Sequence, residues 1–308
     1  MLTGVIASLV SADMNRAQEL AGSIAKLNDK GRLLMYYKRL SEGKLLSIIV
    51  PTEYPATVIN AAISMSLADI GVVVTGYEMD WRDGELLTLV DASSSQLGLA
   101  AADSKESVEK LVNSSGLRLS TLSVSEFAVS LLAHGEKVSS RDESYVFIDR
   151  AFLVKGVGPV ILGYTKMNVY VHDKLYAVPI NKQVEIKSIE VLDEEVDSVG
   201  PGVRIGFAVK GAEVDELKEV YALVPDPSKT VSKLALRVKA YPWTEVPSSG
   251  TLHVVGGGTA VVANIDRYYN GSMELSLSKP LPLLDRYLLV NVNAKQKHSR
   301  VLGYLFPG

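Results

Sequence analysis

The chain has no cysteine among its 308 residues. Disulfide bonds, thiolate catalysis and cysteine-ligated zinc are therefore excluded. The four histidines are far apart in the sequence, and none has the spacing of a helical metal-binding pair: His134, His172, His253 and His298. We therefore expect no dedicated metal site.

Long hydrophobic runs are also missing, so we expect no segment that crosses a membrane. Residues 1–10 are apolar but have no basic flank, and Asp13 follows almost at once. We interpret this segment as a first β-strand rather than a signal peptide. These features favour a soluble, cytoplasmic protein without a membrane partner.

Charge is distributed unevenly along the chain. Residues 1–140 hold 12 Lys and Arg against 16 Asp and Glu, a net charge of −4. Residues 141–225 hold 10 against 14 (−4) and residues 226–308 hold 10 against 5 (+5), which gives the overall −3. A chain of 308 residues is long enough for two or three domains. A basic last segment can mark a surface that faces a polyanion.

The first part of the chain alternates between strand and helix patterns. Apolar residues at three- and four-residue spacing predict a helix over 14–27, with Asp13 as its cap. Continuous apolar runs predict strands buried on both faces. The expected strands are 2–10, 45–50, 70–75, 97–101 and 117–122, and the other expected helices are 58–67, 84–92, 105–113 and 125–133. This order predicts a parallel α/β sheet with helices on both faces.

The rest of the chain consists of short strand patterns separated by turn residues. Residues 145–225 have glycine turns at Gly156, Gly158 and residues 200–202, as in a small closed β-barrel. Residues 229–308 predict a second barrel, in which we interpret Gly256-Gly257-Gly258 as a flexible turn rather than a phosphate-binding loop. Polar linkers then divide the chain into domains at 1–138, 145–225 and 229–308.

Several motifs of the middle domain carry a family resemblance. They include Gly156-Val157-Gly158-Pro159-Val160, Val171-His172-Asp173-Lys174-Leu175 and Gly200-Pro201-Gly202. This stretch resembles the second domain of the translational GTPases of the elongation factor Tu superfamily, most of all the selenocysteine-specific branch. Asn168 and His172 depart from it, since glycines are usual there. The resemblance implies a GTPase-like α/β domain, with Ser66-Leu67-Ala68-Asp69 as a similar run, and a third-domain barrel that ends in an Arg-x-x-Gly strand.

The GTPase motifs of that family are missing. A P-loop needs glycines, a lysine and a hydroxyl to hold phosphates and Mg²⁺. Residues 10–19 contain neither glycine nor lysine, and Asp13 and Glu19 would repel phosphate. The Asp-x-x-Gly motif is replaced by residues 50–54, and of the guanine-reading motif only Asp103 remains in Ala100-Ala101-Ala102-Asp103.

The free energy of the hydrogen bonds that these motifs would make decides what their absence means for GTP binding. Hydrogen bonds to charged groups contribute roughly 1.5–3 kcal/mol each, so losing about four removes some 6 kcal/mol, about four decades of affinity. We therefore expect neither GTP nor Mg²⁺ as a cofactor and no catalytic residue. The degenerate positions are Asp13, Asn15, Arg16, Val50, Glu53, Ala100 and Asp103.

Cationic and aromatic residues of the last domain form a candidate RNA surface. Cations beside aromatic rings suit an RNA backbone with splayed bases. The candidates are Arg237, Lys239, Arg267, Lys295, Lys297 and Arg300, with Tyr241, Trp243, Tyr268 and Tyr269 nearby. The resemblance implies that such barrels hold the acceptor arm of tRNA.

Three functions follow as hypotheses. The first is a degenerate elongation-factor-like protein, without GTPase activity, that binds tRNA, ribosomal RNA or the ribosome. The second is a protein-interaction scaffold with a translation-factor partner. The third is an enzyme with an atypical nucleotide site. The acidic run 193–197 is interpreted as a solvated loop rather than a metal site.

Overall fold

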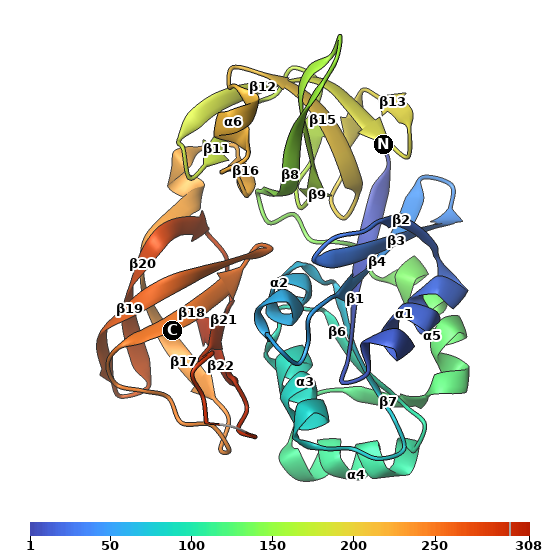
Figure 1. The fold of residues 1–308 in the computed structure, drawn as a ribbon, viewed down its shortest axis with the longest axis vertical. Coiled ribbons are helices and arrows are strands. Elements are labelled where there is room, and N and C mark those ends of the chain that lie inside the picture. The colour runs from blue at the N-terminus through green and yellow to red at the C-terminus, as the bar shows by residue number, and fades with distance from the viewer. Residues whose placement is uncertain (296) are drawn as a thin grey trace.

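The computed structural model describes residues 1–295 and 297–308 and contains three structural units (Figure 1). An α/β unit is followed by two antiparallel β-barrels, which confirms the predicted fold class. Among the described residues, no helix combines the length and apolar character needed to span a membrane.

The α/β unit has a seven-stranded sheet in the order β2-β3-β4-β1-β5-β6-β7. The strands β1, β4, β5, β6 and β7 are parallel, and their central members are apolar and buried because helices cover both faces. The elements are β1 (Thr3–Ser11), α1 (Met14–Ile24), β2 (Lys26–Asp29), β3 (Leu33–Ser41), β4 (Lys44–Pro51), α2 (Ile59–Leu67), β5 (Ile70–Thr75), α3 (Trp81–Ala92), β6 (Leu97–Ala102), α4 (Lys105–Ser115), β7 (Ser120–Ser123) and α5 (Val124–Lys137).

Two differences from the predicted sheet occur at one edge. The helix α1 ends at Ile24 rather than at residue 27, and Lys26–Asp29 forms the edge strand β2. Strand β3 was not predicted, and both β3 and β2 run antiparallel to their neighbours, so the sheet is mixed rather than wholly parallel. Ala25 already has extended backbone angles, which stops the helix before the apolar pattern ends.

The second unit closes into a barrel because β12 pairs with both β15 and β11. The ring runs β11-β16-β8-β9-β15-β12, and β13 extends β12 as a hairpin. Gly156 and Gly158 turn the chain between β8 and β9 with positive φ, as predicted. The elements are β8 (Val146–Val154), β9 (Gly158–Thr165), β10 (Val169–Tyr170), β11 (Lys174–Val178), β12 (Lys182–Val191), β13 (Glu194–Val196), β14 (Ser198–Val199), β15 (Arg204–Lys210), α6 (Val214–Leu217) and β16 (Ala222–Val224).

The third unit is a closed barrel in the order β17-β20-β19-β18-β21-β22. Its elements are η1 (Pro227–Lys229), β17 (Thr230–Ala240), β18 (Thr251–Gly256), β19 (Thr259–Tyr269), β20 (Ser272–Pro282), β21 (Tyr287–Val290) and β22 (Val301–Phe306). In Figure 1 its strands β18, β21 and β22 face α2 and α3 of the α/β unit.

The triple-glycine turn lies in this contact between units. It is a turn between β18 and β19, as predicted, and all three glycines are buried. A Cβ on Gly258 would lie 2.4 Å from the Phe147 ring, and the Gly258 amide donates to the Ser66 hydroxyl (3.0 Å). Glycine is therefore needed because three units meet here.

Candidate nucleotide and RNA sites

The turn between β1 and α1 is where a GTPase of this fold class would hold phosphates. Here Asp13 caps α1, as predicted, and its Oδ1 accepts from the amides of Asn15 (3.0 Å) and Arg16 (3.4 Å). Free amides at a helix N-terminus are a ready site for an anion. In this chain the protein's own carboxylate takes those amides and brings a negative charge to the same place.

A cavity of about 460 Å³ lies beside this turn. Its carboxylates include Asp13, Glu78 and Asp83, and burial raises the pKa of Asp83. Its two arginines are already paired: Arg16 with Asp103, and Arg82 with Asp80 (2.8 Å). The cavity therefore offers a polyphosphate acidic groups, together with arginines that are already paired with carboxylates.

The other degenerate positions make contacts of their own. Asp103, at the end of β6, is tied to Arg16. Val50 and Ala100 are fully buried strand residues that supply no polar group. Glu53 has a left-handed backbone (φ 72°) and accepts from the Asn60 side chain (2.9 Å). The structure thus brings Asp13, Arg16 and Asp103 together, while the side chain of Glu53 is held by α2.

A buried ion pair joins the α/β unit to the second barrel. The Lys166 ammonium lies 2.9 Å from Asp69 and 3.7 Å from Glu143, and the side chains of Lys166 and Asp69 are each 3% exposed. Burial alone would lower the pKa of Lys166, but the two carboxylates outweigh it and raise that pKa. Asp69 also accepts from the amide of Ile6 (2.8 Å) and from Ser140 (3.1 Å). Sequence reasoning noted the run that ends at Asp69 but gave it no role.

A second ion pair joins α3 to the third barrel. The Arg300 guanidinium contacts the fully buried Glu85 at 2.6 Å, and the Arg300 amide donates to the same carboxylate (2.6 Å). The Tyr54 hydroxyl also donates to Glu85 (3.1 Å). Arg300 was predicted as an RNA-binding residue near a loop. The structure corrects this, because its charge is satisfied within the protein.

The remaining basic candidates lie on the surface of the third barrel. Arg237 and Lys239 on β17 are exposed, as is Arg267 on β19, whose guanidinium lies 5.8 Å from the Tyr269 ring centre. Arg237 and Tyr269 both pair with Ser272 of β20, so they share the outer face. Lys295 and Lys297 are exposed in the loop after β21.

The aromatic candidates include both exposed and buried residues. Tyr269 is 64% exposed, and Tyr268 is half-buried. Tyr241, in contrast, is buried, and its hydroxyl donates to Asp91 of α3 (2.5 Å). The expectation that Tyr241 offers a surface to RNA is therefore wrong. Its ring instead supports Trp243, with centroids 5.1 Å apart.

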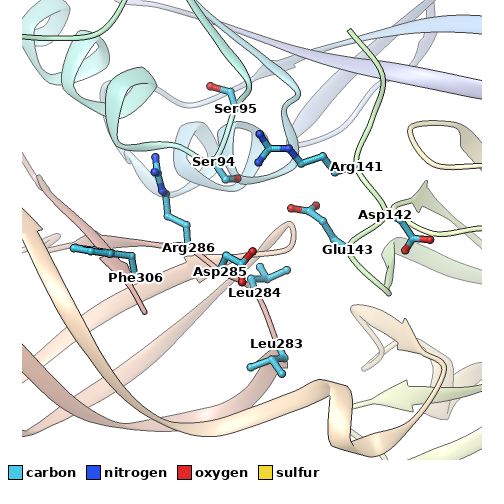
Figure 2. Close-up of a pocket in the computed structure, with 10 residues that line it drawn as sticks. All are labelled: Ser94, Ser95, Arg141, Asp142, Glu143, Leu283, Leu284, Asp285, Arg286 and Phe306. Atoms are coloured by element: carbon cyan, nitrogen blue, oxygen red, sulfur yellow. The ribbon is translucent and has the colours of Figure 1, made fainter. Parts of the chain in front are cut away.

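A further cavity of about 310 Å³ lies where the units meet (Figure 2). Its lining comes from residues 94–95 after α3, residues 141–143 of the linker and residues 283–286 and 306 of the third barrel. In Figure 2 the Glu143 carboxylate reaches from the linker toward Ser94. Burial raises the pKa of Glu143. Sequence reasoning could not find this cavity, because its walls come from three distant segments.

The α/β unit and the two barrels together form a known fold. This is the fold of the translational GTPases of the elongation factor Tu superfamily. The whole chain superimposes on a bacterial selenocysteine-specific elongation factor, EF-Sec, with a TM-score of 0.80 at 14% identity, and covers 58% of that chain. It superimposes on elongation factor SelB from Methanococcus maripaludis with TM-scores of 0.77 for the apo form and 0.78 for the complex with the GTP analogue GppNHp, both at 16% identity, covering 80% and 79% of those chains.

Sequence comparison gives the particular relatives. The chain is 25% identical over 275 residues to an uncharacterized protein of Methanocaldococcus jannaschii, covering 84% of this chain and 87% of that protein. It is 38% identical over 95 residues to the selenocysteine-specific elongation factor of the same organism, covering 30% of this chain and 20% of that factor. No family model matches the chain. The chain is thus similar in fold to elongation factors, and its sequence match covers only a fifth of the selenocysteine-specific factor of Methanocaldococcus jannaschii.

Proposed function

We propose that this protein is a translation-factor-like RNA binder that acts without a bound nucleotide. The observation that carries the proposal is the carboxylate of Asp13 on the N-terminal amides of α1. A phosphate placed there would have to displace a charge-assisted hydrogen bond and then meet the neighbouring carboxylates.

The contacts between units support a protein that does not switch. In a GTPase the γ-phosphate orders loops that collapse after hydrolysis. Here the units are joined by the buried pairs Lys166–Asp69 and Arg300–Glu85, which need no ligand. The arrangement is therefore held by the chain itself.

The third barrel supports the RNA part of the proposal. Arg237, Lys239 and Arg267 are exposed cations on neighbouring strands, with the exposed ring of Tyr269 among them. Such a combination attracts a phosphate backbone and offers a base a surface for stacking. The family resemblance makes tRNA the first RNA to test.

Calorimetric titration with GTP and GDP in the presence of Mg²⁺ tests the nucleotide part. We expect no binding up to millimolar nucleotide, because the charge in the turn is of the wrong sign. The variant Asp13→Asn keeps a helix cap but removes one negative charge, and it should also fail to bind, since no lysine lines the cavity within the described part of the chain. Micromolar binding by the natural protein would refute the proposal.

A filter-binding series with tRNA at rising salt tests the RNA part. We expect binding at low salt with a negative slope of log K against log salt. Each of Arg237→Gln, Lys239→Gln and Arg267→Gln should reduce that slope by about 1 if the residue contacts phosphate. The control Lys218→Gln alters an exposed lysine of the second barrel and should leave the slope unchanged. Absence of binding at low salt would rule out the RNA function.

A further inference from the structure

Both tryptophans of the chain line one groove of about 410 Å³. It lies between α3, the end of α4 and the segment that precedes β22. We call it the tryptophan groove. Its apolar walls are formed by Trp81, Leu87, Leu111, Leu117 and Trp243.

The bare backbone of Gly84 in α3 also lines this groove. Glycine weakens the interior of a helix relative to alanine. Nothing in the chain requires it here: φ is not positive, and a Cβ would meet no atom within 4 Å. The glycine leaves open space in the groove, and a partner could approach the helix backbone there.

Three of the polar side chains that line the groove are already engaged. Thr88 donates to the Gly84 carbonyl (2.7 Å), Ser299 donates to the Val301 carbonyl (3.0 Å), and Glu85 is held by Arg300. A nucleobase would need donors and acceptors along its edge. An apolar side chain needs no hydrogen-bond donor or acceptor, so the groove favours a protein partner over RNA.

One lysine and one histidine line the rim of the groove, and both Lys297 and His298 are exposed. Trp243 is 39% exposed, and its orientation is fixed because it stacks on Tyr241, which is bonded to Asp91. A rigid aromatic residue beside an apolar pocket is typical of an interface hot spot, because its side chain loses little conformational entropy on binding.

We propose that the tryptophan groove docks a protein partner through a short segment in which a large apolar side chain is flanked by Asp or Glu. The apolar side chain fills the space above Gly84, and the acidic residues face Lys297 and His298. The exposed cations Arg237, Lys239 and Arg267 do not line this groove, so the proposal does not depend on RNA binding.

Phage display of random 12-residue peptides on the purified full chain tests the proposal. We expect a consensus with Leu, Phe or Trp next to Asp or Glu. A synthetic peptide of that consensus made without tryptophan should change the intrinsic tryptophan fluorescence, because both tryptophans lie in the groove. Gly84→Leu should weaken its binding at least tenfold by filling the space, and Lys297→Glu should weaken it several-fold, more so at low salt.

The control Val129→Leu changes an exposed residue of α5 and should leave peptide affinity unchanged. Thermal unfolding should show that Gly84→Leu is at least as stable as the natural protein, because leucine is the better helix former. A consensus without acidic residues, no enriched peptide, or binding that Gly84→Leu leaves intact would overturn the proposal. So would displacement of the peptide by tRNA, or a homodimer in size-exclusion chromatography that Gly84→Leu dissociates, since either outcome names another occupant.

Discussion

At the scale of single residues, one side chain changes the charge that the β1–α1 turn presents to a ligand. The β1–α1 turn still presents helix amides to an anion, but Asp13 accepts from two of them and repels a second negative group. Asp103 likewise pairs with Arg16 within the protein. The capping role of Asp13 was correctly predicted from its place before the helix, whereas the pairing of Asp103 with Arg16 was not predicted.

Glu143 gives a pH prediction at this scale. Burial raises its pKa above the ordinary 4.5, so the folded protein holds the proton more tightly than the unfolded chain does. Stability is therefore greatest below about pH 4.5 as far as this group is concerned, and it falls as pH rises through the folded pKa. Glu143→Gln removes the titration, so it should be more stable than the natural protein at pH 7, with the difference vanishing below pH 4.5.

Urea unfolding midpoints measured between pH 4 and pH 8 check this prediction. The control Glu126→Gln alters a fully exposed carboxylate of α5 and should not show the same dependence. If Glu143→Gln proves less stable than the natural protein at pH 7, the contact of Glu143 with Lys166 outweighs the cost of burial and the prediction is wrong.

At the scale of elements, the Arg300–Glu85 pair joins α3 to the segment that precedes β22. Removing one partner leaves a buried charge uncompensated, so Glu85→Gln or Arg300→Met should destabilise the protein by about 3–5 kcal/mol. The double variant Glu85→Leu with Arg300→Met should recover most of that loss, because no charge is then left buried. Guanidinium unfolding measures both effects.

An exposed pair at the N-terminus of the same helix provides the matched control. Arg82 and Asp80 have side chains that are 39% and 43% exposed, and Arg82→Met should cost less than about 1 kcal/mol. Equal losses for Arg82→Met and Arg300→Met would contradict the role of the buried pair.

Most elements could be predicted from periodicity, and the predictions that failed did so for physical reasons. The alternation of 272–278 gave part of β20, and the apolar run 45–50 gave β4. The apolar spacing of α1 continues past Ile24, but the backbone turns extended at Ala25 to form an edge strand. The local sequence pattern does not predict this end of the helix, because β2 is formed by its pairing with β3, which is a tertiary contact.

At the scale of the whole molecule, the sequence alone could not place the charges that join the units. Arg300 has the appearance of a surface cation in a basic segment, yet its partner lies 215 positions earlier in the chain. Lys166 and Asp69 are 97 positions apart, and the family-like run that ends at Asp69 does not indicate its partner. The resemblance predicted three units, whereas only the structure shows that buried ion pairs hold them together.

These junctions predict how the molecule unfolds. With Lys166 and Asp69 each 3% exposed at the contact between the α/β unit and the second barrel, the units should unfold in one calorimetric transition. Lys166→Met leaves the Asp69 carboxylate buried without its cation, a loss of about 3–5 kcal/mol. The second barrel should then separate as a transition of its own. Lys182→Met, which breaks an exposed pair with Glu216 inside that barrel, should keep the single transition. Two transitions in the natural protein would mean that the buried pair does not couple the units, and a nucleotide-driven change in their arrangement would again be open to test.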